Sequence, residues 1–361
     1  MRWSFSIGRI AGIPVRLHVT FLVFVAWMAV SEGITSGDTR RALSTLAFLL
    51  LVFSCVVLHE LGHALAARGF GIRTQDIVLL PIGGVARLER MPEKPSQELV
   101  VALAGPLVNV VIVALLTVVP PLLGRPLAGA TFGSGVLGSL LFVNKAMIAF
   151  NLIPAFPMDG GRVLRALLAM GMPFAKATRV ASIVGQALAL GLAAVGLFGH
   201  NNILIFIALF VFLAAGEERA IVETRSSLSG VPVRDAMLTD FLTLDVEDSL
   251  QRAVDYLIAG SQADFPVLEG EVPIGTLGRG DLILALQNQG VGVRAGDVVR
   301  RDPAAAAPGE PLEGVLQRMR ERGRTALPVL ENGRVVGLIT LENISDLLVV
   351  NAALRKHAGA A

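Results

Sequence analysis

The chain has 361 residues, of which 53% are hydrophobic and 17% are charged. Soluble globular domains carry about 25% charged residues, so the composition argues against an entirely soluble protein. The formal net charge of +2 gives no argument for nucleic acid as a partner, and the single cysteine, Cys55, excludes an internal disulfide. We therefore expect the lipid bilayer to be a partner of this chain and nucleic acid not to be one.

Six apolar runs occur before residue 217, and several reach the length of about 20 residues that spans a bilayer. We expect transmembrane helices over residues 16–31, 42–66, 98–119, 136–153, 180–198 and 202–216. After the second of these helices, two short stretches around a Pro/Gly turn predict a small β-hairpin over residues 76–87. Lysine and arginine concentrate before the first span and after the second and fourth, which predicts that both termini of this multi-pass protein of the cell membrane are cytoplasmic.

The second predicted span ends in a motif that combines two histidines with a glutamate, Leu58-His59-Glu60-Leu61-Gly62-His63. His59 and His63 are four residues apart, so on a helix they share one face and can bind one metal ion. Glu60 lies about 100° around the helix from His59, near enough to act as a base on water at the metal. Ionisable groups in a membrane span are costly and usually functional. The alternative is a core cluster in which the three side chains only satisfy one another.

A catalytic zinc normally takes three protein ligands, so the motif requires a third. Asp159 is the best candidate, because it follows the fourth span on the side of the membrane expected for His63. It lies in a Pro- and Gly-rich stretch, and non-helical backbone at membrane depth is tolerated where it lines a cavity. A simple turn that leads into a helix explains Asp159-Gly160 equally well.

Two separated motifs resemble the site-2 protease family of intramembrane zinc metalloproteases: His59-Glu60-Leu61-Gly62-His63 and Asn151-x-x-Pro154-x-x-Pro157-x-Asp159-Gly160. Two further features, Gly105-Pro106-x-x-Asn109 in the third span and Gly83-Gly84 in the hairpin, are similar to the same family. The resemblance implies one Zn²⁺ per chain, bound by His59, His63 and Asp159. It also implies that Glu60 is the general base, which takes a proton from water and passes it to the leaving amine.

The resemblance assigns Asn151 and Asn109 to the substrate or to the tetrahedral intermediate. For each asparagine, a structural hydrogen bond between helices is the alternative. The implied substrate is a membrane-embedded protein, such as a regulator of the anti-sigma or pro-sigma type, cut in or near a transmembrane segment. An unwound segment could pair with the hairpin at Gly83 and Gly84 by β-augmentation, unless the hairpin only packs against the helices.

After residue 216 the sequence becomes an ordinary soluble mixture that contains an internal repeat. Phe265-Pro266-Val267-Leu268 is followed 62 residues later by Leu327-Pro328-Val329-Leu330. Each repeat predicts the order strand, helix, strand, strand, helix. We expect a linker over residues 217–230, repeats over 231–290 and 293–350, and a tail over 351–361.

The repeats resemble a tandem pair of cystathionine-β-synthase (CBS) domains, which often bind adenine nucleotides between them. The family signature places Ser or Thr three residues and Asp six residues after a glycine. The first repeat has Asp281 but Gly278 in place of the hydroxyl residue, and the second has Thr340 but Asn343 in place of the aspartate. A nucleotide site at Asp281 and Thr340 therefore competes with a purely structural role, or with a role in a homodimer.

Together these features predict a polytopic α-helical membrane protein in which an intramembrane metalloprotease domain, residues 1–216, precedes an α/β tandem CBS pair. A CBS-gated transporter or channel, with an ion path through the histidines and Asp159, is the alternative of another class. Glu60 separates the two hypotheses, because a permeation site does not need a general base between the histidines.

Overall fold

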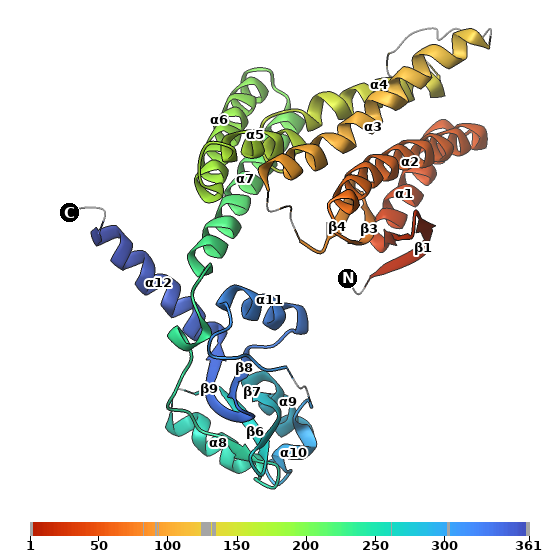
Figure 1. Ribbon diagram of the computed structural model, residues 1–361. Coiled ribbons are helices and arrows are strands. Elements are labelled where there is room, and N and C mark those ends of the chain that lie inside the picture. Colours follow the sequence, from red (N-terminus) through yellow and green to blue (C-terminus); the bar gives the residue numbers. More distant parts are fainter. Residues whose placement is uncertain are drawn as a thin grey trace. The chain divides into compact units, whose positions relative to one another are not determined.

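The computed structural model describes residues 3–358 except 82, 91, 93, 124–130, 132–134, 261, 302 and 303. The chain forms two compact units, Met1–Ala220 and Ile221–Ala361 (Figure 1). Most of residues 124–135, a Gly-rich segment before the fourth predicted span, lie outside the described residues. The mostly helical first unit and the α/β second unit agree with the predicted fold class.

The N-terminal unit is built mainly from helices. They are α1 (Val19–Ser36), α2 (Thr39–Gly69), α3 (Pro95–Leu122), α4 (Val136–Asn151), α5 (Asp159–Ala169), α6 (Phe174–Phe198) and α7 (Asn202–Leu228). Among the described residues, α1, α2, α3 and α6 are long and apolar enough to cross a membrane. Helix α4 is apolar but shorter, and the apolar part of α7 is followed directly by Glu217, Glu218 and Arg219. The predicted number of six spans therefore stays a prediction.

Helix α2 carries the histidine motif and packs closely against α3. Its start is capped by Asp38, whose carboxylate accepts a hydrogen bond from the backbone N–H of Arg40 at 2.8 Å. Gly62 faces α3, and a Cβ at this position would lie 2.8 Å from the carbonyl oxygen of Ala104. The glycine between the two histidines thus permits the close approach of α3, which brings further side chains to the motif.

The predicted hairpin is present and belongs to a larger sheet. The four strands β1 (Ser4–Ile10), β2 (Ile13–His18), β3 (Thr74–Leu80) and β4 (Gly83–Leu88) pair in this order. The β2–β3 pair is parallel and the other two pairs are antiparallel. Because β4 is the last strand in this order, it is an edge strand. Asp76 on β3 pairs with Arg87 on β4 and lies 3.5 Å from Arg16 on β2. The Arg87 hydrogen bond holds the pKa of the Asp76 carboxyl below its usual value, although burial opposes the shift.

The C-terminal unit contains two similar repeats. The first has β5 (Leu244–Asp245), α8 (Leu250–Ala259), β6 (Asp264–Glu269), β7 (Val272–Gly278), α9 (Arg279–Gln289) and α10 (Ala295–Val298). The second has α11 (Leu312–Arg322), β8 (Ala326–Glu331), β9 (Arg334–Thr340) and α12 (Leu341–Ala358), and a short 3-10 helix, η1 (Val233–Asp235), precedes both. The predicted first strand of the second repeat is reduced, among the described residues, to a parallel bridge between Ala306 and Val329. Each repeat has its own apolar core.

The segment expected to be a linker, residues 217–230, is helical as far as Leu228, the last residue of α7. Its serines indicate a flexible segment, but the charged residues and alanine before them are good helix formers and continue the preceding helix. Leu228 is buried in the core of the second repeat. Helix α7 therefore starts in the N-terminal unit and ends in the C-terminal unit.

Candidate metal centre

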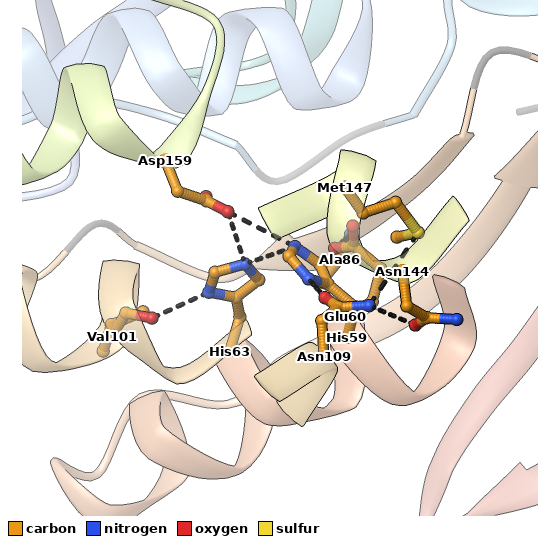
Figure 2. Close-up of polar contacts among 9 residues, drawn as sticks. All are labelled: His59, Glu60, His63, Ala86, Val101, Asn109, Asn144, Met147 and Asp159. Atoms are coloured by element: carbon orange, nitrogen blue, oxygen red, sulfur yellow. Dashed lines mark hydrogen bonds and ion pairs between the residues drawn. The ribbon is translucent and has the colours of Figure 1, made fainter. Parts of the chain in front are cut away.

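His59, His63 and Asp159 converge in the N-terminal unit, and all three are buried (Figure 2). The Nε2 atoms of the two histidines lie 3.1 Å apart on one face of α2. Asp159 is the first residue of α5, and its Oδ2 atom lies 3.3 Å from Nε2 of His59 and 3.2 Å from Nε2 of His63. A simple turn at Asp159 does not explain this meeting of three ligand atoms.

Hydrogen bonds on the far side of each imidazole fix which nitrogen faces the centre. Nδ1 of His63 lies 2.7 Å from the carbonyl oxygen of Val101, which can only accept, so this nitrogen carries the proton. Nδ1 of His59 lies 2.5 Å from Oδ1 of Asn109, whose amide in turn donates to Asn144 at 2.9 Å. Both Nε2 atoms therefore face Asp159, as in histidine ligands whose other nitrogen is held by an acceptor, and in the neutral imidazole these are the atoms that carry the lone pair.

The three side chains fit a zinc ion. A tetrahedral zinc with ligands at about 2.0–2.1 Å separates its ligand atoms by about 3.3 Å, close to the distances of 3.1, 3.2 and 3.3 Å found here. Oδ2 of Asp159 is buried and, within the described part of the chain, has no hydrogen-bond partner. A cation between the three atoms would give this buried carboxylate oxygen a partner.

The space for the ion depends on Gly105 of α3. A Cβ at this position would lie 2.2 Å from Nε2 of His63 and 2.8 Å from Nε2 of His59. Any larger residue would therefore fill the centre or displace the histidines. Residue type, donor atoms and space thus fit a small cation between two nitrogens and one oxygen.

Glu60 lies beside the centre and points toward the edge strand β4. Its Oε2 atom accepts a hydrogen bond from the backbone N–H of Ala86 at 3.0 Å (Figure 2). The strand can approach because Gly84 has no side chain, since a Cβ there would lie 2.7 Å from Cγ of Glu60. The carboxylate is half-buried and is thereby held between the metal centre and the sheet.

A cavity of about 840 Å³ adjoins this group. Its polar lining includes His59, Glu60 and Asn151, and the backbone of Gly83 and Gly84 forms part of its wall. The rest is mainly apolar and comes from α2 and α4, including Val52, Phe53, Phe142, Met147 and Phe150. The cavity therefore connects the candidate metal centre to the start of β4.

The two asparagines singled out in the sequence lie in different places. Asn151, the last residue of α4, is half-buried and lines the cavity. Asn109 has 0% exposure and lies behind His59, where it links α2 to Asn144 on α4. For Asn109 the structure thus shows the alternative weighed above, a hydrogen bond between helices.

Sequence reasoning missed Asn144. A signal for it existed, since a polar amide within an apolar helix is uncommon, and the structure shows Asn144 fully buried. The amide of Asn144 donates to the carbonyl oxygen of Leu140 at 2.9 Å and to the sulfur of Cys55 at 3.5 Å. The carbonyl of Val101 and the N–H of Ala86 could not have been found, because backbone groups carry no signal in the sequence.

The candidate nucleotide residues lie in the C-terminal unit and already have partners. Asp281, in the first turn of α9, pairs with Arg300 at 2.9 Å. The buried hydroxyl of Thr340 contacts the side chain of Asn343 and accepts its backbone N–H at 3.1 Å. At Gly278, where the CBS signature has a hydroxyl residue, a Cβ would lie 2.9 Å from Oδ1 of Asp264.

The same division of the chain appears in comparisons with known proteins. The family model for peptidase family M50 matches residues 47–125 and 126–192, and the CBS domain model matches 233–288 and 295–350. The zinc metalloprotease MJ0392 of Methanocaldococcus jannaschii is 32% identical over 344 residues, which cover 95% of this chain and 96% of that protein. The chain belongs to peptidase family M50.

A second relative agrees with this membership. The putative zinc metalloprotease Rip3 of Mycobacterium tuberculosis is 31% identical over 379 residues, covering 97% of this chain and 94% of that protein. The family models and these two relatives confirm the resemblance drawn from the two motifs. A solved structure of the site-2 protease from M. jannaschii is 38% identical and covers 60% of this chain and 95% of its own, with a TM-score of 0.45. This M50 member is a membrane metalloprotease with a CBS pair, and the transporter hypothesis is set aside.

Proposed function

We propose that this M50 member is a zinc-dependent intramembrane endopeptidase that hydrolyses a peptide bond in or near a transmembrane segment of a membrane protein. One observation carries the proposal: His59, His63 and Asp159 converge beside Glu60 at the wall of a mainly apolar cavity that leads to an edge strand. An apolar cavity suits a segment that comes from lipid, and an edge strand suits an extended backbone.

In this proposal His59, His63 and Asp159 hold the metal, and Glu60 moves the proton. Zinc, when bound, supplies a Lewis acid that polarises the scissile carbonyl and makes water acidic enough to attack at neutral pH. Glu60 takes the proton from that water and delivers it to the leaving amine. The N–H of Ala86 orients one oxygen of this carboxylate and leaves the other for the proton.

Asn151 and the edge strand would position the substrate. The side chain of Asn151 would donate to the oxygen of the scissile carbonyl as negative charge develops there. The substrate segment would lie along β4 at Gly83 and Gly84, since β4 pairs with β3 on one side only.

The charge of the loops supports an orientation with both termini and the CBS pair in the cytoplasm. The substrate class proposed is a membrane-embedded regulator, such as one of the anti-sigma or pro-sigma type.

The proposal is tested with the full-length protein in lipid vesicles that also contain a panel of single-span membrane proteins. We expect about one zinc per chain, cleavage of at least one panel member within its transmembrane segment, loss of cleavage after chelation and recovery on addition of zinc. His59→Ala serves as the inactive reference and Lys176→Gln, an exposed residue of α6, as the matched control. A metal-loaded protein that cleaves no panel member faster than His59→Ala would count against the proposal.

We also infer that the CBS pair senses an adenine nucleotide. The carboxylate of Asp281 could exchange Arg300 for the two hydroxyls of a ribose, because this ion pair is partly solvated and therefore weak. Titration of ATP, ADP and AMP into the full-length protein should show binding that Asp281→Ala weakens, with cleavage responding to the same nucleotide. No binding of any of the three at millimolar concentration would leave the pair as a docking or homodimer module.

A further inference from the structure

Arg165 of α5 is the largest fully buried side chain in the described chain, with 1% exposure, and it has no part in the chemistry proposed above. A buried guanidinium is costly unless its charge is paired and its N–H groups are hydrogen-bonded. The cost is higher still among apolar helices of a membrane protein. The partners of Arg165 therefore indicate what it is for.

Arg165 joins three helices through two carboxylates. Its Nε and Nη2 atoms donate to Oε1 of Glu98 on α3 at 2.8 and 2.5 Å. Its Nη1 atom donates to Oε1 of Glu218 on α7 at 2.5 Å. The rings of Phe156 and Phe174 lie 5.0 and 4.9 Å from the guanidinium carbon, within cation–π range.

Arg165 and Asp159 belong to the same short helix. Helix α5 has 11 residues, and the two residues are separated by less than two turns. At its start, Gly160 and Gly161 pack directly on backbone, since a Cβ would lie 2.3 Å from the carbonyl oxygen of Ile153 and 2.6 Å from the carbonyl carbon of Ala155. A helix this short moves as a body, so a shift of Arg165 is passed on to the Asp159 carboxylate.

Glu98 depends on Arg165, because its second oxygen, Oε2, is buried and has no hydrogen-bond partner among the described residues. Glu218 is different, since its side chain is 30% exposed. It lies on α7, which continues to Leu228, whereas the C-terminal unit begins at Ile221. Glu218 is therefore bound to Arg165 on one side and covalently continuous with the helix that enters the CBS unit on the other.

We propose that Arg165 is a positioning residue that holds Asp159 at the metal centre, and that Glu218 makes this position depend on α7. The proposal rests on the ligand role of Asp159 given under Proposed function. A displacement of α7 is passed to the metal ligand through this guanidinium, beside the apolar packing of α7 on Met158 and on Leu164 of α5.

Cobalt is the probe that separates positioning from mere structural support. Co²⁺ replaces zinc in tetrahedral sites, and its visible absorption reports the ligands and their geometry. We would load the full-length protein with Co²⁺, record the spectrum and determine the Co²⁺ dissociation constant, together with the thermal unfolding midpoint. The variants are Arg165→Lys, which keeps the charge but loses the fork of donors, Glu218→Gln, and Lys176→Gln as control.

We expect Arg165→Lys and Glu218→Gln to alter the Co²⁺ spectrum and to raise the dissociation constant by less than the range of about 10- to 100-fold that is usual for groups in direct contact with a metal ligand, with the larger rise in Arg165→Lys. Lys176→Gln should change neither. In the Asp159→Ala background, Arg165→Lys should add no further loss of Co²⁺ affinity. If Arg165→Lys does not fold, the half-exposed Glu218 still provides the test.

The results distinguish the two proposals. Wild-type spectra and affinities for both Arg165→Lys and Glu218→Gln, with only lower unfolding midpoints, would overturn the positioning role. An unchanged Co²⁺ spectrum in Asp159→Ala would instead overturn the ligand set itself. The link through α7 has its own test: Ile221→Pro, which interrupts α7 at an exposed position, should alter the spectrum more strongly in the wild-type background than in Glu218→Gln. An unchanged spectrum in the wild-type background would remove α7 from the proposal.

Discussion

The candidate ligand-binding residues of the two units differ in burial and in their partners. In the N-terminal unit, the candidate ligands His59, His63 and Asp159 are buried, and their partners come from distant parts of the chain. In the C-terminal unit, the Asp281 side chain is 25% exposed and pairs with Arg300, itself 61% exposed. The first arrangement leaves a buried carboxylate oxygen without a donor, whereas the second is satisfied without a ligand.

This difference shows that unpaired polar atoms indicate a binding site more clearly in a buried region than near the surface. Where water is excluded, each polar atom needs a defined partner, so a missing partner points to a missing ligand when other possible ligand atoms lie beside it, as at Asp159. Near the surface, solvent can replace any partner, so an ion pair is compatible both with a binding site and with none. Substitutions should therefore have large effects at the metal centre and small ones in the CBS pair.

The largest effect is expected for Asp159→Ala. Removal of one of three ligands leaves two histidines, so zinc content should fall well below one per chain and cleavage should drop to the level of His59→Ala. Elemental analysis after gel filtration gives the zinc content, and Asp76→Asn, a buried aspartate of the sheet, is the matched control. Full zinc content in Asp159→Ala would show that the third ligand is another residue.

Glu60→Gln should keep zinc and lose catalysis. Glutamine preserves the shape and still accepts the Ala86 N–H, but it cannot take a proton from water. General acid–base catalysis contributes about 10²- to 10⁴-fold to the rate, so kcat should fall by that factor while zinc content stays at the wild-type level. Turnover near the wild-type value would exclude Glu60 as the base and with it the mechanism proposed here.

These two predictions concern residues that the sequence identified before the fold was known. The spacing of His59 and His63 and the apolar run before them predicted both the helix and its function. Its position made Asp159 the best candidate for the third ligand but explained a simple turn equally well, and the family resemblance decided between the two, because nothing local shows that α5 returns to α2. The strands β1 and β2 escaped notice for two reasons. The pairing of β2 with β3 spans the whole of α1 and α2, and the large apolar side chains of β1 are exposed.

A smaller effect is expected at Asn109, where the fold changes the interpretation of the sequence. Asn109→Leu keeps the branched shape but removes the acceptor for Nδ1 of His59, so zinc affinity should fall by about 10- to 100-fold. Asn144→Leu should weaken zinc less, since it acts on His59 only through Asn109. Competition with a chelator provides both affinities. Normal zinc affinity with a raised KM in Asn109→Leu would return this residue to the substrate role.

The smallest effect is expected in the CBS pair, at Asp264. This buried carboxylate accepts the hydroxyl of Thr325 at 2.5 Å and so joins the two repeats. Burial raises the pKa of Asp264 above its ordinary value of 3.8, the Thr325 hydrogen bond opposes the shift, and the charges of Glu342 and Asp281 add to it. The folded state therefore holds this proton more tightly than the unfolded state does. As the pH rises from 3.8 through the folded pKa, the free energy of unfolding should fall, and the loss is complete above that pKa.

Asp264→Asn removes the buried charge but keeps an oxygen that accepts the Thr325 hydroxyl. The variant should match the wild type below pH 3.8 and should unfold at a higher temperature at pH 7, because only the wild type then carries the desolvated charge. The chain's single tyrosine, Tyr256, packs against Phe265 in this unit, whereas the tryptophans, Trp3 and Trp27, lie in the other unit. Near-ultraviolet signals of tyrosine can therefore follow the CBS unit within the full-length protein, with the exposed Asp240→Asn as control. An unfolding temperature at pH 7 equal to or below that of the wild type would show that Asp264 is ionised at no cost. The surroundings of Asp264 would then resemble solvent rather than the metal centre.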